Sequence, residues 1–451
     1  MLFRSLSSLI LGLMLCANKG SAQSIEPVAK YVVLITVDGM RPEMVSDLTM
    51  PSPTIKQIAN DGIFVERMFT IAPSSTYPNH AALVTGARAV HHGIYYNSPF
   101  LGNNNATNRM SYWYADSIKC QTIWGVAKQH GLTTCSLFWP TSTNSKEIDI
   151  NIPEFWSTER EVDNLQFLRP YSTPVGIFDS IQKYATGILT TPTFHPSTRN
   201  REGRTGYMAS YIFDQYRPNL TTIHFISTDA FQHATGTESN DTKMALSSVD
   251  YGINQVIEGL TRAKMIDSTV VIVCGDHGFV NTTKTISPNV WLTQAGLLTD
   301  NPDDWRAKFH GAGVTMFLYL HNPNDVEAIE ITKRKLSSLP ESKRSLFRIV
   351  EKDELAELGC DPHVSLAVEP ILGVAIATNT TGDDVVERFR GNHGYLLPHD
   401  PTTLVAFGPG IPKAKVISSI SITDVAPFVM RLLGIDFHTP NGKFHPEMME
   451  R

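Results

Sequence analysis

The sequence predicts an α/β protein built on a central, mostly parallel sheet. Short apolar runs rich in β-branched residues recur along the chain, as is typical of strands buried on both faces. Segments with helical periodicity lie between these runs, and such alternation indicates a sheet flanked by helices. The 451 residues, 42% of them hydrophobic and 18% charged, are enough for one large domain with a substantial core.

The expected elements follow in chain order. The apolar runs predict strands at 31–37, 221–227, 269–275, 371–377 and 403–408. The helical patterns predict helices over 54–61, 76–85, 243–264, 285–296 and 423–433. We therefore expect a single domain over residues 23–451.

Two segments have weak periodicity and are expected to lie over the sheet edge. The segment from about 141 to 205 is rich in Pro, Thr, Asn and Ser, which predicts a small inserted lobe. The loop 98–116 combines a run of asparagines with an aromatic cluster. We expect both segments to cover a functional site.

The N-terminus has the features of an export signal. Arg4 precedes an apolar run, and Gly20 and Ala22 supply the small residues expected before a cleavage site. A buried N-terminal helix and a lipoprotein signal ending at Cys16 are the alternatives. We expect residues 1–22 to be removed and the protein to be periplasmic or secreted.

Charge and hydropathy narrow the possible partners. The formal net charge is −6 and no Lys/Arg stripe stands out, so no nucleic-acid-binding surface is evident. No later apolar run approaches the roughly 18 residues needed to cross a bilayer, so no transmembrane segment is expected in the mature chain. A small-molecule substrate is consistent with both observations. Four cysteines remain after the leader, and their three possible pairings stay open: Cys120, Cys135, Cys274 and Cys360.

Acidic residues and histidines follow the predicted strands. Ligands of open α/β sheets bind beyond the carboxyl ends of the strands, so side chains at these positions can converge. A D-x3-H spacing, if helical, places both side chains on one face, and a further histidine lies among glycines in GNHGY. The residues concerned are Asp38, Asp229, His233, Asp276, His277 and His393.

This set of three carboxylates and three imidazoles is typical of a metal site. Zinc accepts mixed nitrogen and oxygen ligands, and six ligands suit two metals about 3.5–4 Å apart better than one. Taken singly, each residue has a simpler explanation, because Asp38 could cap a turn and His393 could be an ordinary loop residue. The combination favours metal binding.

A run of hydroxyl residues precedes a predicted helix in PSSTYPNHAALVTG, residues 73–86. Thr76 is either a helix cap or a nucleophile. The helix N-terminus offers oriented N–H groups and partial positive charge, which suit a phosphoryl oxygen. A nearby metal would make the threonine hydroxyl a competent nucleophile. With the metal ligands present, we predict attack by Thr76 on an anionic ester.

Several motifs together resemble the nucleotide pyrophosphatase/phosphodiesterase family of the alkaline phosphatase superfamily. The resemblance runs from about residue 31 to 434 and implies an alkaline-phosphatase-like three-layer fold. The motifs are VDGMRPE (37–43), PSSTYPNHAALVTG (73–86), HGIYYN (92–97), the D-x3-H pair, GDHGF (275–279) and HGY (393–395).

The resemblance implies two Zn²⁺ per chain and a phosphodiesterase or nucleotide pyrophosphatase acting through a covalent phospho-threonine. Family substrates include nucleotides and phospholipid headgroup esters. The implied ligands of one zinc are Asp38, Asp276 and His277, with Thr76 beside it, and those of the other are Asp229, His233 and His393.

The resemblance also implies roles in substrate binding. Asn97 would donate to a phosphoryl oxygen, assisted by the backbone N–H of Tyr77. Tyr77 and His224 fall at positions where nucleotide-cleaving members carry aromatic residues. His224 replaces the expected tyrosine, and Gln232 replaces a small residue before the zinc-ligand position His233. These departures leave Thr76 and the zinc-ligand positions unchanged and concern their surroundings, where a substrate would bind.

Other functions remain as alternatives. A phosphonoacetate hydrolase would use the same ligands, and an alkaline phosphomonoesterase would need a cationic residue near the phosphate, for which Arg41 is the nearest candidate. A sulfatase is disfavoured because the C/S-x-P-x-R motif is missing. A catalytically inactive exported binding protein is also disfavoured, since every expected ligand position is filled.

Overall fold

The computed structural model describes residues 25–102, 111–155, 164–195, 197–198, 200–299, 301, 303–396 and 399–450. The segment expected to be an export signal, 1–22, lies outside these ranges. Within them, every helix is too short or too polar to span a bilayer.

In the described part of the chain, the central sheet has eight strands in the order β15-β2-β14-β6-β1-β5-β3-β4. The run from β6 to β4 is parallel, whereas β14 is antiparallel to both of its neighbours. The strands are β1 (Tyr31–Val37), β2 (Ile63–Phe69), β3 (Thr134–Leu137), β4 (Ile150–Ile152), β5 (Leu220–Phe225), β6 (Thr269–Gly275), β14 (Thr402–Phe407) and β15 (Lys415–Ser421).

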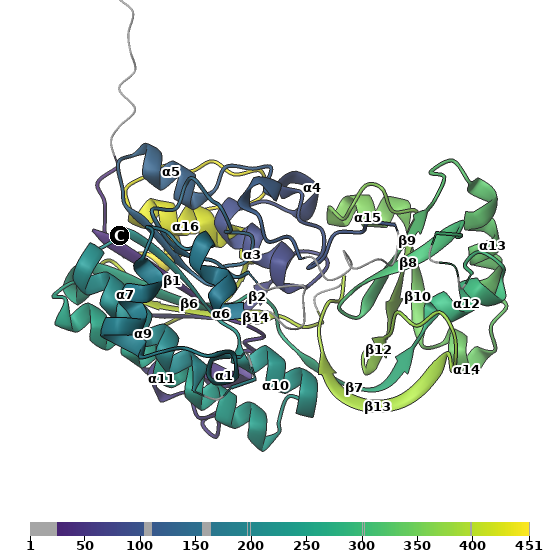
Figure 1. The fold of residues 1–451 in the computed structure, drawn as a ribbon, viewed down its shortest axis with the longest axis horizontal. Helices are drawn as coiled ribbons and strands as arrows, with labels where there is room; N and C mark the ends of the chain where they lie inside the picture. Colours follow the sequence, from purple (N-terminus) through teal and green to yellow (C-terminus); the bar gives the residue numbers. More distant parts are fainter. Residues whose placement is uncertain are drawn as a thin grey trace, which may run out of the picture.

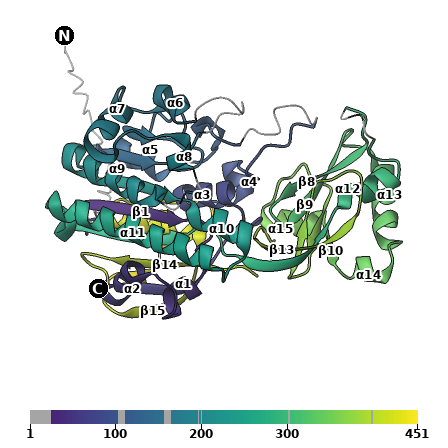
Figure 2. The same ribbon diagram turned by 60° about the horizontal axis from the view of Figure 1, so that its bottom comes forward.

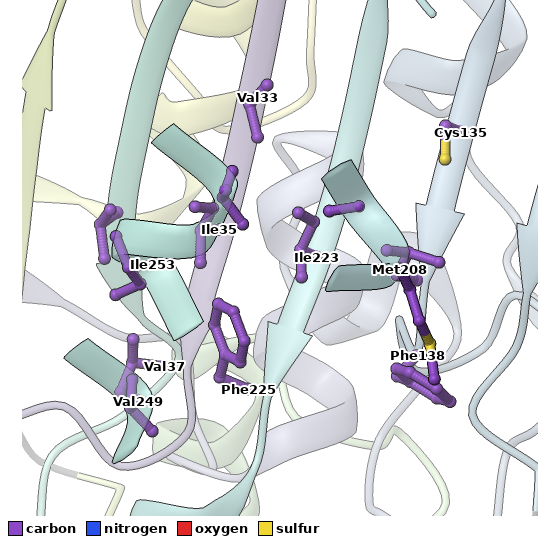
Figure 3. Packing of buried hydrophobic residues seen from close by; sticks show 14 of the residues in the cluster. Val33, Ile35, Val37, Cys135, Phe138, Met208, Ile223, Phe225, Val249 and Ile253 are labelled. Carbon is purple, nitrogen blue, oxygen red and sulfur yellow. The ribbon is translucent and has the colours of Figure 1, made fainter. Parts of the chain in front are cut away.

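Helices cover both faces of this sheet and make three layers (Figures 1 and 2). Neighbouring side chains of β1 enter different cores: Val33 and Ile35 pack with α9 and α11, and Leu34 packs with α3, α5 and α16. Figure 3 shows the first core, where Met208 of α9 and Val249 and Ile253 of α11 gather with Ile35 and Ile223. Burial on both faces explains the continuous apolar runs.

The helices around the central sheet include two long ones, α9 (Arg201–Tyr216) and α11 (Asn240–Arg262), which pack together. The others are α1 (Glu43–Ser46), α2 (Pro53–Asp61), α3 (Thr76–Thr85), α4 (Ala89–His92), α5 (Ile123–Gln129), α6 (Asn164–Leu168), α7 (Ile177–Ile181), α8 (Thr191–Phe194), α10 (Ser227–Thr235) and α16 (Val425–Leu432).

A second lobe lies beside the central sheet and carries its own sheets (Figure 1). In its described residues, one sheet has the order β10-β11-β9-β8 and the other β12-β7-β13. The elements are β7 (Val280–Ile286), α12 (Pro288–Gln294), β8 (Ala307–Ala312), β9 (Thr315–Leu320), α13 (Val326–Ser337), α14 (Glu341–Arg344), β10 (Phe347–Glu351), α15 (Lys352–Leu358), β11 (Leu366–Pro370), β12 (Val374–Ile376) and β13 (Val385–Asn392).

The expected α/β class with a mostly parallel sheet is confirmed, but two individual elements differ. The predicted strand 371–377 is confirmed only over β12, Val374–Ile376, because Ile371 and Leu372 are 49% and 53% exposed in the turn between β11 and β12. The predicted helix 285–296 begins only at Pro288, after β7 has ended. An apolar run does not reveal which of its residues face water.

The segment 141–205, expected as an inserted lobe, contributes helices to the first core where it is described. Leu168, Ile177, Ile181 and Phe194 are buried there with α9 and α11. The lobe with its own sheets comes later in the chain, between β6 and β14.

Asp250 provides a test of how α11 supports the sheet edge. Its buried carboxylate accepts hydrogen bonds from the N–H groups of Thr54 (3.1 Å) and Ile55 (2.9 Å) at the start of α2, where the side chain of the N-cap Ser52 makes no capping bond to the helix. Asp250→Ala should lower the free energy of unfolding by about 1–3 kcal/mol, because two amides lose their acceptor. Urea denaturation measures this.

The matched control is Asn254→Ala, one turn further along α11, whose side chain bonds Glu258 of the same helix. It should change the free energy of unfolding by less than about 0.5 kcal/mol. Equal losses in the two variants would contradict the capping role.

Candidate active site

Strand register brings the acidic residues together at one sheet edge. Val37 of β1 pairs with Gly275 of β6, so Asp38 and Asp276, the next residues, leave the sheet side by side. Val37 also pairs with Phe225 of β5, and Asp229 follows in the first turn of α10. His233 lies one turn later on the same helix, at 3.3 Å from Asp229 (Nε2 to Oδ1).

Thr76 is the first residue of α3, and its hydroxyl faces this edge. Thr76 Oγ1 lies 3.3 Å from His277 Nε2. The turn before it is held by Asn79, whose side chain donates to the carbonyl of Ser75 (2.9 Å) and accepts from the N–H of Ile71 (3.0 Å). The nucleophile candidate therefore lies on a helix end fixed by buried hydrogen bonds.

His393 reaches the same edge from the second lobe, directly after β13. Its ring stacks on that of His277, with 3.6 Å between centroids and 7° between planes. Its Nε2 lies 3.6 Å from Asp229 Oδ1. The ligand candidates thus come from both lobes.

Backbone carbonyls orient the three histidines. The Nδ1 atoms of His233, His277 and His393 each lie within hydrogen-bonding distance of a carbonyl oxygen, those of Gly391 (3.0 Å), Gly278 (3.1 Å) and Ser74 (2.8 Å) respectively. An Nδ1–H donated to a carbonyl leaves Nε2 as the lone-pair nitrogen, which is the arrangement of metal-binding histidines. All three Nε2 atoms face the carboxylates.

The donor set fits metal ions. Asp38, Asp229 and Asp276 each keep one buried carboxylate oxygen without a hydrogen bond. His277 Nε2 lies 3.2 Å from Asp38 Oδ1 and 3.3 Å from Asp276 Oδ2. Two ligands bound to one zinc at 2.0–2.1 Å and the tetrahedral angle would be about 3.3 Å apart, which these separations match.

The candidates fall into two overlapping groups. Ligand atoms of Asp229, His233 and His393 lie within 4.8 Å of one another, and so do those of Asp38, Asp229 and His277. Asp229 thus lies within reach of both groups. The resemblance assigned it to one zinc only.

The electrostatics of the buried carboxylates also favour a bound cation. Burial, and then the charge of Asp38, raise the pKa of Asp276 to about 8. Burial alone would lower the pKa of His277, but Asp276 and Asp38 raise it to about 10. Burial, with His277 and His233 nearby, holds the pKa of His393 well below its usual value. Divalent cations would take the place of the protons that balance the carboxylates.

Asn97 lies next to the start of α3. Its Oδ1 accepts a hydrogen bond from the N–H of Tyr77 (3.0 Å). That N–H, which the resemblance assigned to a phosphoryl oxygen, is therefore used to orient Asn97. The amide nitrogen of Asn97 is the group that can donate to a phosphoryl oxygen.

The side chains of Tyr77 and His224, expected to contact substrate, lie in the interior and are 5% and 1% exposed. The hydroxyl of Tyr77 donates to Glu154 Oε1 (2.9 Å). The ring of His224 lies between Glu154 and Asp38. Neither ring presents an open face to a base.

Several polar residues around the site had no signal in the sequence. Glu154 follows β4, and Asp400 precedes β14 with its carboxylate 2.8 Å from the hydroxyl of Ser74. Burial, which dominates, raises the pKa of Asp400 to about 7. Both carboxylates approach the site only through the fold, and no spacing relates them to the ligands.

Gln232 has a structural explanation for its departure from the family pattern. Its Oε1 accepts from Arg41 Nε (3.0 Å) and its Nε2 donates to the carbonyl of Gly39 (2.9 Å). Arg41 also donates to the carbonyl of Thr237 (2.9 Å) and pairs with Glu238. The side chain therefore ties α10 to the end of β1.

Comparison with known proteins agrees with the resemblance found in the sequence. Residues 32–396 match the family described as type I phosphodiesterase / nucleotide pyrophosphatase. The bis(5'-adenosyl)-triphosphatase ENPP4 of Bos taurus is 23% identical over 438 residues, covering 94% of this chain and 82% of that protein. Human ectonucleotide pyrophosphatase/phosphodiesterase family member 5 is 22% identical over 435 residues, 93% of this chain and 78% of that protein.

Solved structures show the same fold. Human ENPP5 superposes with a TM-score of 0.66 at 20% identity and covers 92% of this chain and 97% of its own. An inactive threonine-to-alanine variant of murine ENPP5, in complex with AMP, gives a TM-score of 0.65 at 20% identity with the same coverage.

Gln232→Ala tests the tie between α10 and β1. We expect the free energy of unfolding to fall by about 1–3 kcal/mol, because Arg41 Nε loses its acceptor and the Gly39 carbonyl its donor. Chemical denaturation of this variant and of Gln57→Ala, whose exposed amide bonds Asp61 within α2, gives the comparison. A loss no larger than in the control would show that the tie contributes nothing.

Proposed function

The chain belongs to the type I phosphodiesterase/nucleotide pyrophosphatase family, and we propose that it hydrolyses phosphodiester or pyrophosphate bonds with two Zn²⁺ and a phospho-threonine at Thr76. The observation that carries the proposal is the cluster of unsatisfied carboxylate oxygens and Nε2 atoms beside the Thr76 hydroxyl. The solved structure of murine ENPP5, an inactive threonine-to-alanine variant in complex with AMP, supports a threonine nucleophile and a nucleotide-type substrate.

The proposed ligands are Asp38, Asp276 and His277 for one zinc and Asp229, His233 and His393 for the other. When bound, the two metals supply Lewis acidity and favour the ionised Thr76 hydroxyl. Asn97 holds a phosphoryl oxygen through its amide nitrogen, and the N-terminus of α3 adds favourable dipoles. Thr76 Oγ1 bonds to phosphorus as the bond to the leaving group breaks. The oxygen of a water molecule then bonds to phosphorus as the Oγ1–phosphorus bond breaks, a proton of the water returns to Oγ1, and the phosphate monoester is released.

A diester is preferred over a monoester because the nearest cationic candidate is engaged elsewhere. A monoester brings an additional negative charge that needs a cationic partner. Arg41 directs its guanidinium to Gln232, Thr237 and Glu238. A phosphonoacetate hydrolase is the second candidate, since it would use the same ligands.

We further propose that the protein acts outside the cytoplasm, in the periplasm or the medium, on small phosphodiester substrates. The support is the leader-like segment 1–22 and the ectonucleotide names of the relatives. A nucleotide or a choline phospholipid headgroup would fit this proposal.

Thr76→Ala is the test of the nucleophile. Turnover should fall by at least about 10³-fold, since the variant lacks the hydroxyl that forms the proposed covalent intermediate. Bound zinc, measured by elemental analysis, should stay at two per chain because the carboxylates and imidazoles are intact. Thr85→Ala, which removes a buried hydroxyl bonded to the Ala81 carbonyl in the same helix, is the control. Near-normal turnover in Thr76→Ala would refute the assignment.

Substrate preference is a separate prediction. Bis(p-nitrophenyl) phosphate should be hydrolysed at least about 10-fold faster than p-nitrophenyl phosphate, because Arg41, the nearest cationic candidate, is engaged by other groups and leaves the extra charge without a partner. Rates on both esters and on phosphonoacetate, at equal zinc, decide between the candidates. Faster turnover of the monoester or of the phosphonate would replace the diesterase assignment.

A further inference from the structure

His224 is buried beside the metal-ligand candidates and connects two carboxylates, those of Asp38 and Glu154. It lies near the end of β5, where Thr36↔His224 is the register with β1. Its Nε2 is 3.3 Å from Asp38 Oδ2 and its Nδ1 is 3.0 Å from Glu154 Oε2. The ring of His80 packs against it with 4.3 Å between centroids, which fixes its plane.

Glu154 extends this connection to the nucleophile helix. Its other oxygen, Oε1, accepts from the hydroxyl of Tyr77 (2.9 Å), the residue after Thr76. The carboxylate is 7% exposed, so water competes little for these bonds. One continuous chain of hydrogen bonds therefore runs from Tyr77 through Glu154 and His224 to Asp38.

In this hydrogen-bond network the two carboxylate oxygens of Asp38 have different surroundings. His224 holds Oδ2, while Oδ1 has no hydrogen bond and lies 3.2 Å from His277 Nε2, on the side where a metal would bind. A carboxylate held by one oxygen presents the other in a fixed direction. The other end of the network is Tyr77, in the first turn of α3.

We propose that Glu154 and His224 are a positioning pair that orients the metal ligand Asp38, with Tyr77 of the nucleophile helix as the anchor of the pair. The inference rests on the proposed function, because it assumes zinc at Asp38. It assigns His224 a place behind the metal ligand, in contrast to the substrate contact expected from the sequence. Glu154 affects zinc affinity indirectly, because its link to the ligand Asp38 runs through His224.

The experiment compares Glu154→Gln and His224→Gln with the wild type. Glu154→Gln keeps the size of the side chain and one carbonyl acceptor but removes the carboxylate that holds His224. We expect zinc affinity at one of the two sites, measured by competition with a chelator, to fall about 10- to 100-fold. At limiting zinc, stoichiometry should fall from two to one per chain and kcat should fall with it. Excess zinc should restore kcat.

Asp361→Asn is the matched control. Asp361 is a buried carboxylate in the second lobe that accepts from the hydroxyl of Tyr319 and lies 2.8 Å from the Nδ1 of His363. Like Glu154, Asp361 contacts one tyrosine and one histidine, but it lies away from the site. Its variant should lose thermal stability as Glu154→Gln does, while zinc affinity and the response of kcat to zinc stay at the wild-type level.

The outcomes separate the two proposals. Wild-type protein that binds no zinc would overturn the proposed function and this inference together. Wild-type protein with two zinc ions, beside Glu154→Gln with equal zinc affinity, would overturn the inference alone. A loss of kcat in Glu154→Gln that excess zinc does not restore would also overturn it, because that is the result of a merely structural role. His224→Gln should repeat the zinc result, and Glu154→Gln decides if His224→Gln does not fold.

Discussion

Three carboxylates packed at one edge of a buried sheet are the constraint on which the rest of the site depends. Asp38 and Asp276 leave neighbouring strands in register, so the fold itself forces their charges together. The pKa of Asp276, raised to about 8 by burial and by Asp38, is the electrostatic consequence. The surrounding histidines, hydroxyl and amide are arranged around a cluster that positive charge must balance.

The two lobes supply different residues of the site. The central sheet supplies the carboxylates, because parallel strands end at one edge and their following residues converge there. The chain enters the second lobe after Asp276 and His277 and comes back to the site at the end of β13. His393, the next residue, therefore approaches the carboxylates from the side of the second lobe. The stacking of His393 on His277 and its bond to the Ser74 carbonyl join the lobes at the site itself.

The departures from the family pattern lie beside the candidate metal ligands and not among them. Gln232 uses its amide to connect Arg41 with the Gly39 carbonyl, and His224 connects Asp38 with Glu154. Both side chains are buried, and both bond to residues that directly follow β1: Gln232 to Gly39 and His224 to Asp38. Tyr77 is turned towards Glu154 by the same network, and its hydroxyl donates to that carboxylate.

The sequence by itself determined the α/β class, the four main-sheet strands that were recognised and the residue types of the candidate ligand set, because apolar runs and motif spacing are local signals. Only the tertiary structure decided that residues 371–373 form an exposed turn before β12, that the sheet-bearing lobe follows β6, and that Tyr77 and His224 face inward. Glu154 and Asp400 reach the site from distant segments, and no pattern along the chain relates them to Asp38 or Ser74. Burial and long-range hydrogen bonds are properties of packing, and they assign these side chains their partners.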